Sequence, residues 1–294
     1  MSDPIQIPVV NVFGPGSQIE EEGDTLEYLS MPTSMSTFHP PILPEPEDME
    51  EDISVALVLL NKAANALEEI PINERYLEEG NETLFNLEGM SDGELNMINQ
   101  VLGVGEVSAI IEGPAPIEIQ ESIMAGLWRI HHLDESKKVI GDYIEVATIP
   151  SVIRQLAFQS AHHEVDISTD DLPEGTINSP SILVELDEKV RKHQPEDEPH
   201  VINLSLIPLS PEDVFVLGKR LGVGPVTILS KGYGNCRIGS TACQSTWWIK
   251  YYNSEDSLIL NTIEIVDIPE VASASSEDLT DSAHRLREII EVYQ

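Results

Sequence analysis

Basic residues are scarce in this chain of 294 residues, which has 16 lysines and arginines against 52 aspartates and glutamates and a formal net charge of −36. A surface this negative repels phosphate backbones and anionic lipid, so we expect no nucleic-acid partner and no direct membrane insertion. It attracts basic peptides and basic protein faces instead. The attraction is strongest in the N-terminal part, because Lys62 and Arg75 are the only basic residues before Arg129.

Cysteine is nearly absent. Cys236 and Cys243 are too few for a disulfide framework and are expected to be reduced thiols. The N-terminus lacks the basic and apolar regions of a secretion signal. The longest apolar candidate, residues 53–60, is far shorter than the ~20 residues that span a bilayer. These absences predict a cytoplasmic protein.

The first 50 residues hold eight prolines and ten acidic residues, with neither lysine nor arginine. This composition predicts an extended tail with little packed structure. Its acidic residues Glu45, Glu47 and Asp48 are candidates for attracting a basic partner. The alternative is that they form an ordinary solvated surface without specific binding.

An internal repeat organises the rest of the chain. Leu102-Gly-Val-Gly105 recurs 119 residues later as Leu221-Gly-Val-Gly224, and residues 84–152 share 17 identities with residues 203–271 over 69 ungapped positions. Each copy is too long for a solenoid unit, so the repeat predicts two pseudo-equivalent domains.

Each copy opens with the signals of a helix. Ser91-x-x-Glu94 and Ser210-x-x-Asp213 are typical helix N-caps. Gly103 and Gly222 stand where a left-handed C-cap is needed, so we interpret the repeated glycine motif as a structural turn.

Strand-like segments follow each helix. In the second copy they are residues 226–229, 247–252 and 258–266, and turn residues at 253–256 join the last two into a hairpin. We therefore predict an α+β fold of two tandem pseudo-equivalent domains, each a helix plus a small antiparallel sheet, with extra helices and the extended tail. The predicted boundaries are 1–50 for the tail, 51–165 for the first repeat domain, 166–178 for a linker and 179–294 for the second repeat domain.

The sequence contains no catalytic signature, so no catalytic residue and no cofactor are predicted. The two thiols are seven positions apart, which on a strand places them on opposite faces and argues against a shared metal site. The doublets His131-His132 and His162-His163 point opposite ways if extended, so neither is predicted to bind a metal as a pair. An enzyme of unknown type is the least favoured class.

The second copy has a denser set of distinctive residues. Trp247 matches Trp128 of the first copy and is expected in the core, whereas Trp248 replaces Arg129 and is the better candidate for an exposed anchor. The alternative is that helices cover both faces of this strand. The candidate partner-binding residues here are Gly232, Tyr233, Gly234, Cys236, Arg237, Trp248, Tyr252 and Asn253.

Several segments resemble a known family. They are Pro40-Pro-Ile-Leu-Pro-Glu-Pro46, Leu102-Gly-Val-Gly-Glu-Val107, Gly126-Leu-Trp-Arg129, Gly232-Tyr-Gly-Asn-Cys-Arg-Ile238 and Trp247-Trp-Ile-Lys-Tyr-Tyr-Asn253. Together they resemble the HupH/HyaF hydrogenase expression/formation proteins, from about residue 30 to the C-terminus. Cys243 does not belong to that pattern.

The resemblance implies an accessory role in the maturation of an uptake [NiFe] hydrogenase. It implies a scaffold or chaperone for the iron–sulfur small-subunit precursor before export, acting with other hydrogenase accessory proteins. The precursor carries a basic twin-arginine leader, which the acidic surface of this chain would attract. The alternative is an iron or iron–sulfur carrier, or protective factor, that uses Cys236.

Overall fold

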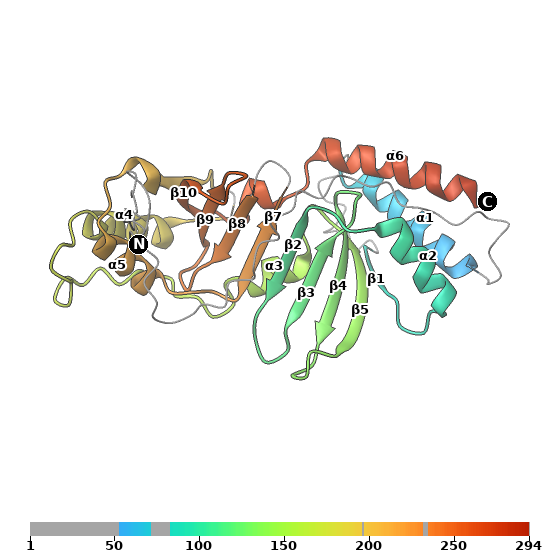
Figure 1. Cartoon of the computed structure of the whole chain (residues 1–294), viewed down its shortest axis with the longest axis horizontal. Coiled ribbons are helices and arrows are strands. Elements are labelled where there is room, and N and C mark those ends of the chain that lie inside the picture. The colour runs from blue at the N-terminus through green and yellow to red at the C-terminus, as the bar shows by residue number, and fades with distance from the viewer. Residues whose placement is uncertain (1–52, 72–82, 196, 232–234, 294) are drawn as a thin grey trace, which may run out of the picture.

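Ten β-strands form one antiparallel sheet that runs through both halves of the molecule (Figure 1). The computed structural model describes residues 53–71, 83–195, 197–231 and 235–293. The strand order is β1-β5-β4-β3-β2-β7-β8-β9-β10-β6. The first half contributes β1 (Leu84–Asn86), β2 (Val107–Ile111), β3 (Ile117–Glu121), β4 (Leu127–Leu133) and β5 (Val139–Val146). The second half contributes β6 (His200–Asn203), β7 (Val226–Ser230), β8 (Asn235–Ser240), β9 (Thr246–Tyr252) and β10 (Leu258–Ile265).

The two halves meet where β2 pairs with β7. Ala109 lies opposite Ile228, which is its own equivalent in the repeat. On either side, Val107 faces Ser230 and Ile111 faces Val226. Equivalent positions therefore pair reciprocally, as they do across the interface of a two-fold dimer. The tandem repeat has become a pseudo-symmetric single sheet.

The repeated glycine motif is a structural turn in both halves, as predicted. Gly103 and Gly222 end their helices with φ values of +56° and +64°, a conformation that favours glycine. A Cβ on Gly105 would lie 2.1 Å from the carbonyl oxygen of Ser122, so only glycine fits at this close approach.

Six α-helices and two short 3-10 helices, Leu204–Leu206 and Glu270–Ala272, complete the described fold. The α-helices are α1 (Ser54–Glu69), α2 (Asp92–Leu102), α3 (Ser151–Leu156), α4 (Ser179–Lys192), α5 (Pro211–Leu221) and α6 (Ser276–Val292). Both predicted N-caps are confirmed as full capping boxes, Ser91 with Glu94 and Ser210 with Asp213. Each such cap typically stabilises a helix by ~1 kcal/mol.

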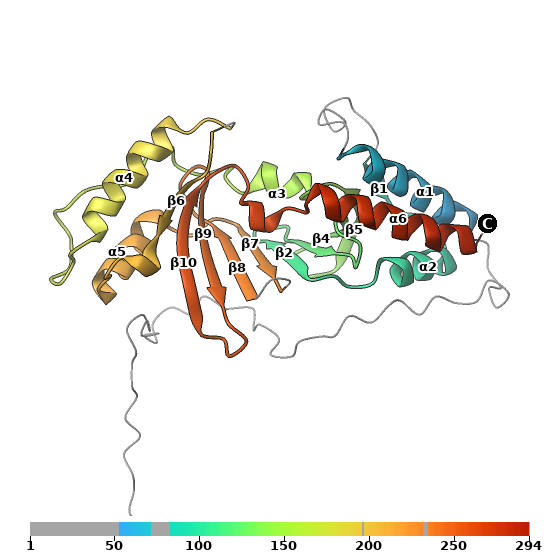
Figure 2. The same cartoon turned by 90° about the horizontal axis from the view of Figure 1, so that it is seen from above.

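Helices cover the two ends of one face of the sheet (Figure 2). Helices α1, α2 and α6 form a core with Phe85, Leu127 and Ile144 in the first half, and α4 and α5 form a second with Ile263 and Ile265. A third core occupies the opposite face and crosses the junction between the halves. It includes the two buried tryptophans, Trp128 and Trp247, and the short helix α3.

Each half also packs one segment against the core of the other half. Helix α6 follows the last strands of the second half, yet Leu279, Leu286 and Ile290 pack into the core of the first half. In the reverse direction, Phe158, which follows α3, stacks edge-on against Trp247 with ring centroids 5.1 Å apart. Separating the halves would therefore expose apolar surface on both.

The segment from 166 to 178, predicted as a linker, is tied to α5. Arg220 forms ion pairs with Asp166 and Asp171. Asp213 accepts hydrogen bonds from the backbone N–H groups of Ile177 and Asn178. Burial alone would raise the pKa of Asp213, but backbone donors lower it to about 2, so it stays ionised.

The predicted α+β class and the paired helix-plus-sheet units are confirmed. The predicted hairpin is β9 and β10, closed by Asn253, whose backbone N–H donates to Ser257. The three strand segments named for the second copy omitted β8 and the edge strand β6. Among helices in the described ranges, none is long and apolar enough to cross a membrane.

Replacing Gly105 by alanine tests the close approach in the turn. We expect Gly105→Ala to lower the free energy of unfolding by ~2 kcal/mol or more, because the new methyl group collides with a backbone oxygen that cannot rotate away. The measurement is denaturant unfolding. Gly113→Ala is the matched control, because no heavy atom lies within 4 Å of its added Cβ. Equal losses in the two variants would contradict this explanation of the motif.

Candidate functional site

Some predicted site residues lie outside the described residues. These are Glu45, Glu47 and Asp48 of the acidic tail and Gly232, Tyr233 and Gly234 before β8. The structure describes the other five on two adjacent strands and the hairpin turn: Cys236 and Arg237 on β8, Trp248 and Tyr252 on β9, and Asn253 in the turn.

Both thiols are buried on opposite sides of the sheet. Cys236 lies in the core that crosses the junction, and Cys243 lies in the core under α4 and α5. Burial raises the pKa of Cys236 to about 12 and that of Cys243 to about 11. A metal ligand or nucleophile must be a thiolate, so this environment opposes both roles. Cys236 instead contacts the hydroxyl of Tyr251, which is itself buried enough to have a raised pKa.

Trp248 is half-buried rather than fully exposed. Its indole N–H donates to Asn261 Oδ1 at 2.6 Å, and its ring packs beside the core under α4 and α5. The Lys250 ammonium lies 5.5 Å from the ring centroid, a cation–π distance. Asn253 caps the turn by accepting the N–H groups of Glu255 and Ser257. These contacts give the segment a defined shape, while its role in partner binding stays a prediction.

The first histidine doublet behaves as the strand geometry predicted. His131 lies 3.2 Å from Asp142, whereas His132 stacks on Tyr143 on the other face. His162 forms an isolated backbone bridge with Cys243. Within the described residues, no cluster of three or more histidine, cysteine, aspartate or glutamate side chains is arranged to hold a metal ion.

Two buried carboxyl groups, those of Glu121 and Glu145, have raised pKa values and accept hydrogen bonds from the backbone. Burial raises the pKa of Glu121 to about 7, and its carboxylate accepts the Gly126 N–H at 3.3 Å. Burial also raises the pKa of Glu145, which accepts the N–H of Ser151. In the register of the sheet, Trp128 on β4 separates these two residues. Each carboxyl group thus accepts a backbone N–H of its own half, from Gly126 for Glu121 and from Ser151 for Glu145.

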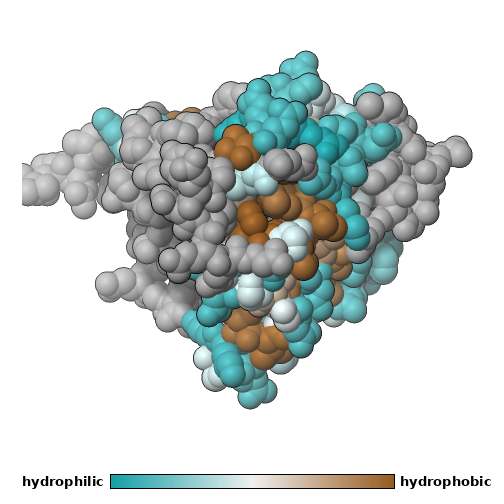
Figure 3. Space-filling model, turned by 90° about the vertical axis from the view of Figure 1, so that its right-hand side faces the viewer, coloured by the Kyte–Doolittle hydropathy of each residue, from teal (hydrophilic) through white to brown (hydrophobic). Residues whose placement is uncertain are grey.

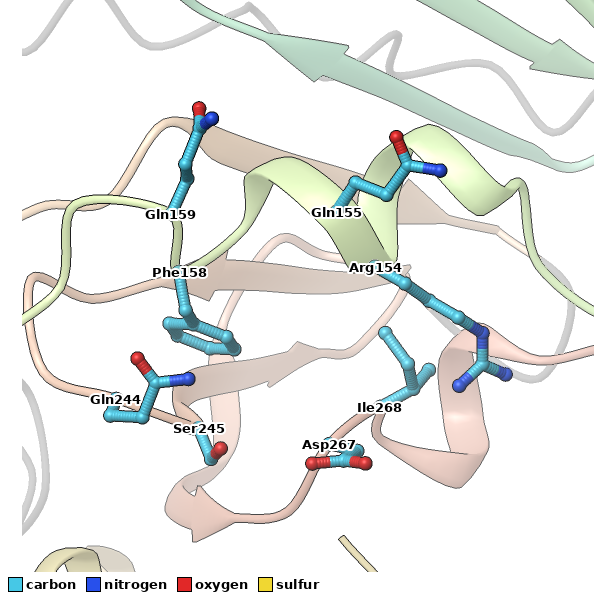
Figure 4. A pocket seen from close by; sticks show the side chains of 8 residues that line it. All are labelled: Arg154, Gln155, Phe158, Gln159, Gln244, Ser245, Asp267 and Ile268. Atoms are coloured by element: carbon cyan, nitrogen blue, oxygen red, sulfur yellow. The ribbon is translucent and has the colours of Figure 1, made fainter.

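A polar pocket lies between the halves (Figure 4). It has a volume of about 320 Å³, and Arg154 and Phe158 from the α3 segment face Gln244, Ser245 and Asp267 of the second half. Burial lowers the pKa of Arg154, and the nearby charge of Asp267 opposes this shift. None of the eight lining residues is a cysteine or histidine. The pocket therefore offers polar contacts without a strong nucleophile.

An apolar surface occupies the end of the molecule where α1, α2 and α6 meet (Figure 3). Val55 and Val58 on α1 are exposed by 55% and 58% of their areas. Partly buried Leu57, Leu95 and Ile289 come from the three helices and pack on the core beneath. Contiguous apolar area of this kind is typical of a surface that binds another chain.

The comparisons with known proteins assign the family. Residues 56–169 and 176–293 each match the HupH hydrogenase expression protein, C-terminal conserved region. The chain belongs to the HupH family. The resemblance carried by the glycine and tryptophan motifs is thereby confirmed, and the family region occurs twice, once in each half of the sheet.

Relatives match along nearly the whole chain. Hydrogenase expression/formation protein HupQ of Azotobacter chroococcum is 43% identical and HoxQ of Cupriavidus necator is 43% identical, with 96% and 97% of this chain and 96% of each relative covered. Hydrogenase-1 operon protein HyaF of Escherichia coli is 30% identical over 95% of this chain and 94% of its own. The solved structure of HupH from Thiobacillus denitrificans is 26% identical, with a TM-score of 0.37, and covers 39% of this chain and 95% of its own.

Sequence reasoning missed three features of the HupH fold. The raised pKa of Glu121, the pocket at Arg154 and the apolar end at Val55 and Val58 all depend on contacts between distant segments. The apolar end had one usable signal, because α1 has valines on the face opposite its buried alanines.

Glu121 predicts a specific dependence of stability on pH. Its pKa of about 7 in the folded chain exceeds the ordinary value of 4.5. The folded state therefore binds the proton more tightly, and this stabilisation is complete below about pH 4.5 and is lost as the pH rises through about 7. Replacing it by glutamine keeps the acceptor for Gly126 and removes the buried charge. We expect Glu121→Gln to raise the free energy of unfolding at about pH 8 by ~2 kcal/mol, with little gain at about pH 5.

Denaturant unfolding across that pH range measures the effect. Glu118→Gln on the same strand removes an equal charge from an exposed position, so it controls for the high net charge. A gain at Glu121 that does not change with pH, or one that Glu118→Gln reproduces, would contradict the assignment.

Proposed function

We propose that this chain is an accessory factor in [NiFe] hydrogenase maturation that holds the iron–sulfur small-subunit precursor before export. The observation that carries the proposal is the match to hydrogenase expression/formation proteins over nearly the full length. Two features of the chain support a holding role rather than a reaction. The described pocket has no strong nucleophile, and the buried thiols resist ionisation.

The net charge of −36 is complementary to the positive charge of a basic export leader. Opposite charge accelerates encounter and selects against acidic competitors, although it adds less to final affinity. The sequence immediately before α1 carries six acidic residues between positions 45 and 52. These include the candidates Glu45, Glu47 and Asp48.

The apolar end at α1 gives the leader a second kind of contact. A twin-arginine leader has a basic pair followed by an apolar stretch. Here an acidic sequence directly precedes a helix with exposed Val55 and Val58. We propose that the apolar stretch of the leader packs on these valines while its arginines meet the acidic sequence. The segment around Trp248 is proposed as a contact for the folded part of the precursor.

A capture experiment with the purified chain tests the proposal. Immobilised full-length chain is expected to retain the small-subunit precursor in preference to the mature subunit, because only the precursor has the leader. Replacing the two leader arginines by glutamine, or raising the salt to ~0.5 M, is expected to reduce retention, because exposed charges are then removed or screened. Equal retention of precursor and mature subunit would remove the leader from the proposal.

The valines can be tested with a matched pair of variants. The double variant Val55→Ser, Val58→Ser is expected to weaken precursor binding by about ten-fold, since burying apolar area of this size contributes ~1–2 kcal/mol. Val184→Ser on α4 is the control, because Val184 is 53% exposed on a helix of the other half. Equal weakening by the control would contradict docking at α1.

The iron-carrier alternative predicts a different experimental result. It requires iron bound to chain purified without oxygen, and loss of that iron in Cys236→Ala. Metal analysis measures both. The burial of this thiol leads us to expect no thiolate-bound iron and unchanged precursor capture in the variant.

A further inference from the structure

The duplicated surfaces differ in the sign of their charge. Three positions of the first half carry Glu112, Glu118 and His131, and the equivalent positions of the second half carry Lys231, Arg237 and Lys250. Only 16 of 294 residues are basic, so three on one duplicated surface are a marked concentration. The second copy of this surface is therefore suited to an acidic ligand, although the chain as a whole repels acids.

The fold brings the three cations to one face of the sheet. Arg237 lies opposite Lys250 across β8 and β9, and Leu229 on β7 lies opposite Arg237. Lys231 is two residues beyond Leu229, which places it on the same side. All three side chains are half-buried. We name Lys231, Arg237 and Lys250 the cationic corner.

The corner lies in the middle of the face whose two ends are covered by helices. Across the junction, the row that contains Arg237 and Lys250 continues through residues that are all polar except Leu229. In order from β4 to β9 the row is Arg129, Gln120, Ser108, Leu229, Arg237 and Lys250. Such a row suits an extended polar segment laid across the strands.

We propose that the cationic corner binds the acidic segment 20–27 of the same chain. This segment contains Glu20, Glu21, Glu22, Asp24 and Glu27, five acids in eight residues. Residues 1–52 contain neither lysine nor arginine, so the tail has no internal cation to neutralise these acids. The corner supplies three cations at high effective concentration because tail and sheet belong to one chain.

Chain length selects this segment over the other acidic run. The tail joins α1, which packs over Ile144 and Val146 on β5. Six strand steps separate β5 from β9 in the sheet, a distance of about 29 Å at ~4.8 Å per step. Residues 45–52 reach at most ~29 Å when fully extended, which leaves no slack, whereas the residues between Glu27 and α1 reach ~85 Å or more. Only the earlier run reaches the corner comfortably.

This inference goes beyond the proposed function and does not depend on it.

Carboxyl-to-amine cross-linking of the full-length chain tests the proposal, because a zero-length reagent joins only groups in contact. We expect Lys250 and Lys231 to couple to acids within 20–27 at least five-fold more often than Lys137 does, and the yield to fall at ~0.5 M salt. Lys137 is the control because it is exposed on the β4–β5 hairpin, away from the corner. Peptide mass spectrometry identifies the sites.

Two further samples identify which segment, and from which chain, occupies the cationic corner. A mixture of isotopically labelled and unlabelled chains is expected to give cross-links only within one chain. Replacing Glu20, Glu21 and Glu22 by glutamine is expected to reduce capture of the remaining acids by Lys250. Three results would overturn the proposal: coupling no greater than at Lys137, cross-links between labelled and unlabelled chains, or coupling of Lys250 to residues 45–52 instead.

Discussion

The antiparallel pairing of β2 with β7 is the interaction on which the molecule depends. Without it, each half would present a long unpaired edge whose backbone groups invite association with other chains. The pairing of Ala109 with Ile228 places equivalent positions on the pseudo-two-fold axis. It also lets one core extend beneath both halves, with Trp128 and Trp247 buried on the same face. The polar row from Arg129 to Lys250 is a direct product of this register.

Symmetry of the backbone has been kept while the surfaces have diverged. Each half retains its capped helix, glycine turn and buried tryptophan, because each of these solves the same local packing problem. The exposed positions are free of that requirement. The first half presents an apolar end at Val55 and Val58, and the second presents the cationic corner. The duplicated scaffold thus presents two surfaces of different chemistry.

Local chemistry in the sequence predicted the local structure well. Ser91 and Ser210 predicted helix starts, and Gly103 and Gly222 predicted helix ends, because caps depend on neighbours within one turn. The burial of Trp247 was also predicted, from its match to Trp128 in the repeat. The union of the two small sheets and the crossing of α6 were not predicted, since both bring together segments that are far apart in sequence. The half-burial of Trp248 has the same cause, because it depends on Asn261 and on helices of another segment.

The register of β2 and β7 can be measured directly by hydrogen exchange of backbone amides, resolved by peptide. An interior strand donates its amides to both neighbours, whereas an edge strand leaves half of them to solvent. We expect β2 and β7 to be as strongly protected as β4 and β9, and the edge strands β1 and β6 to exchange faster. Exchange in β2 and β7 as fast as in β1 and β6 would show that the halves do not share a sheet, and would contradict the account.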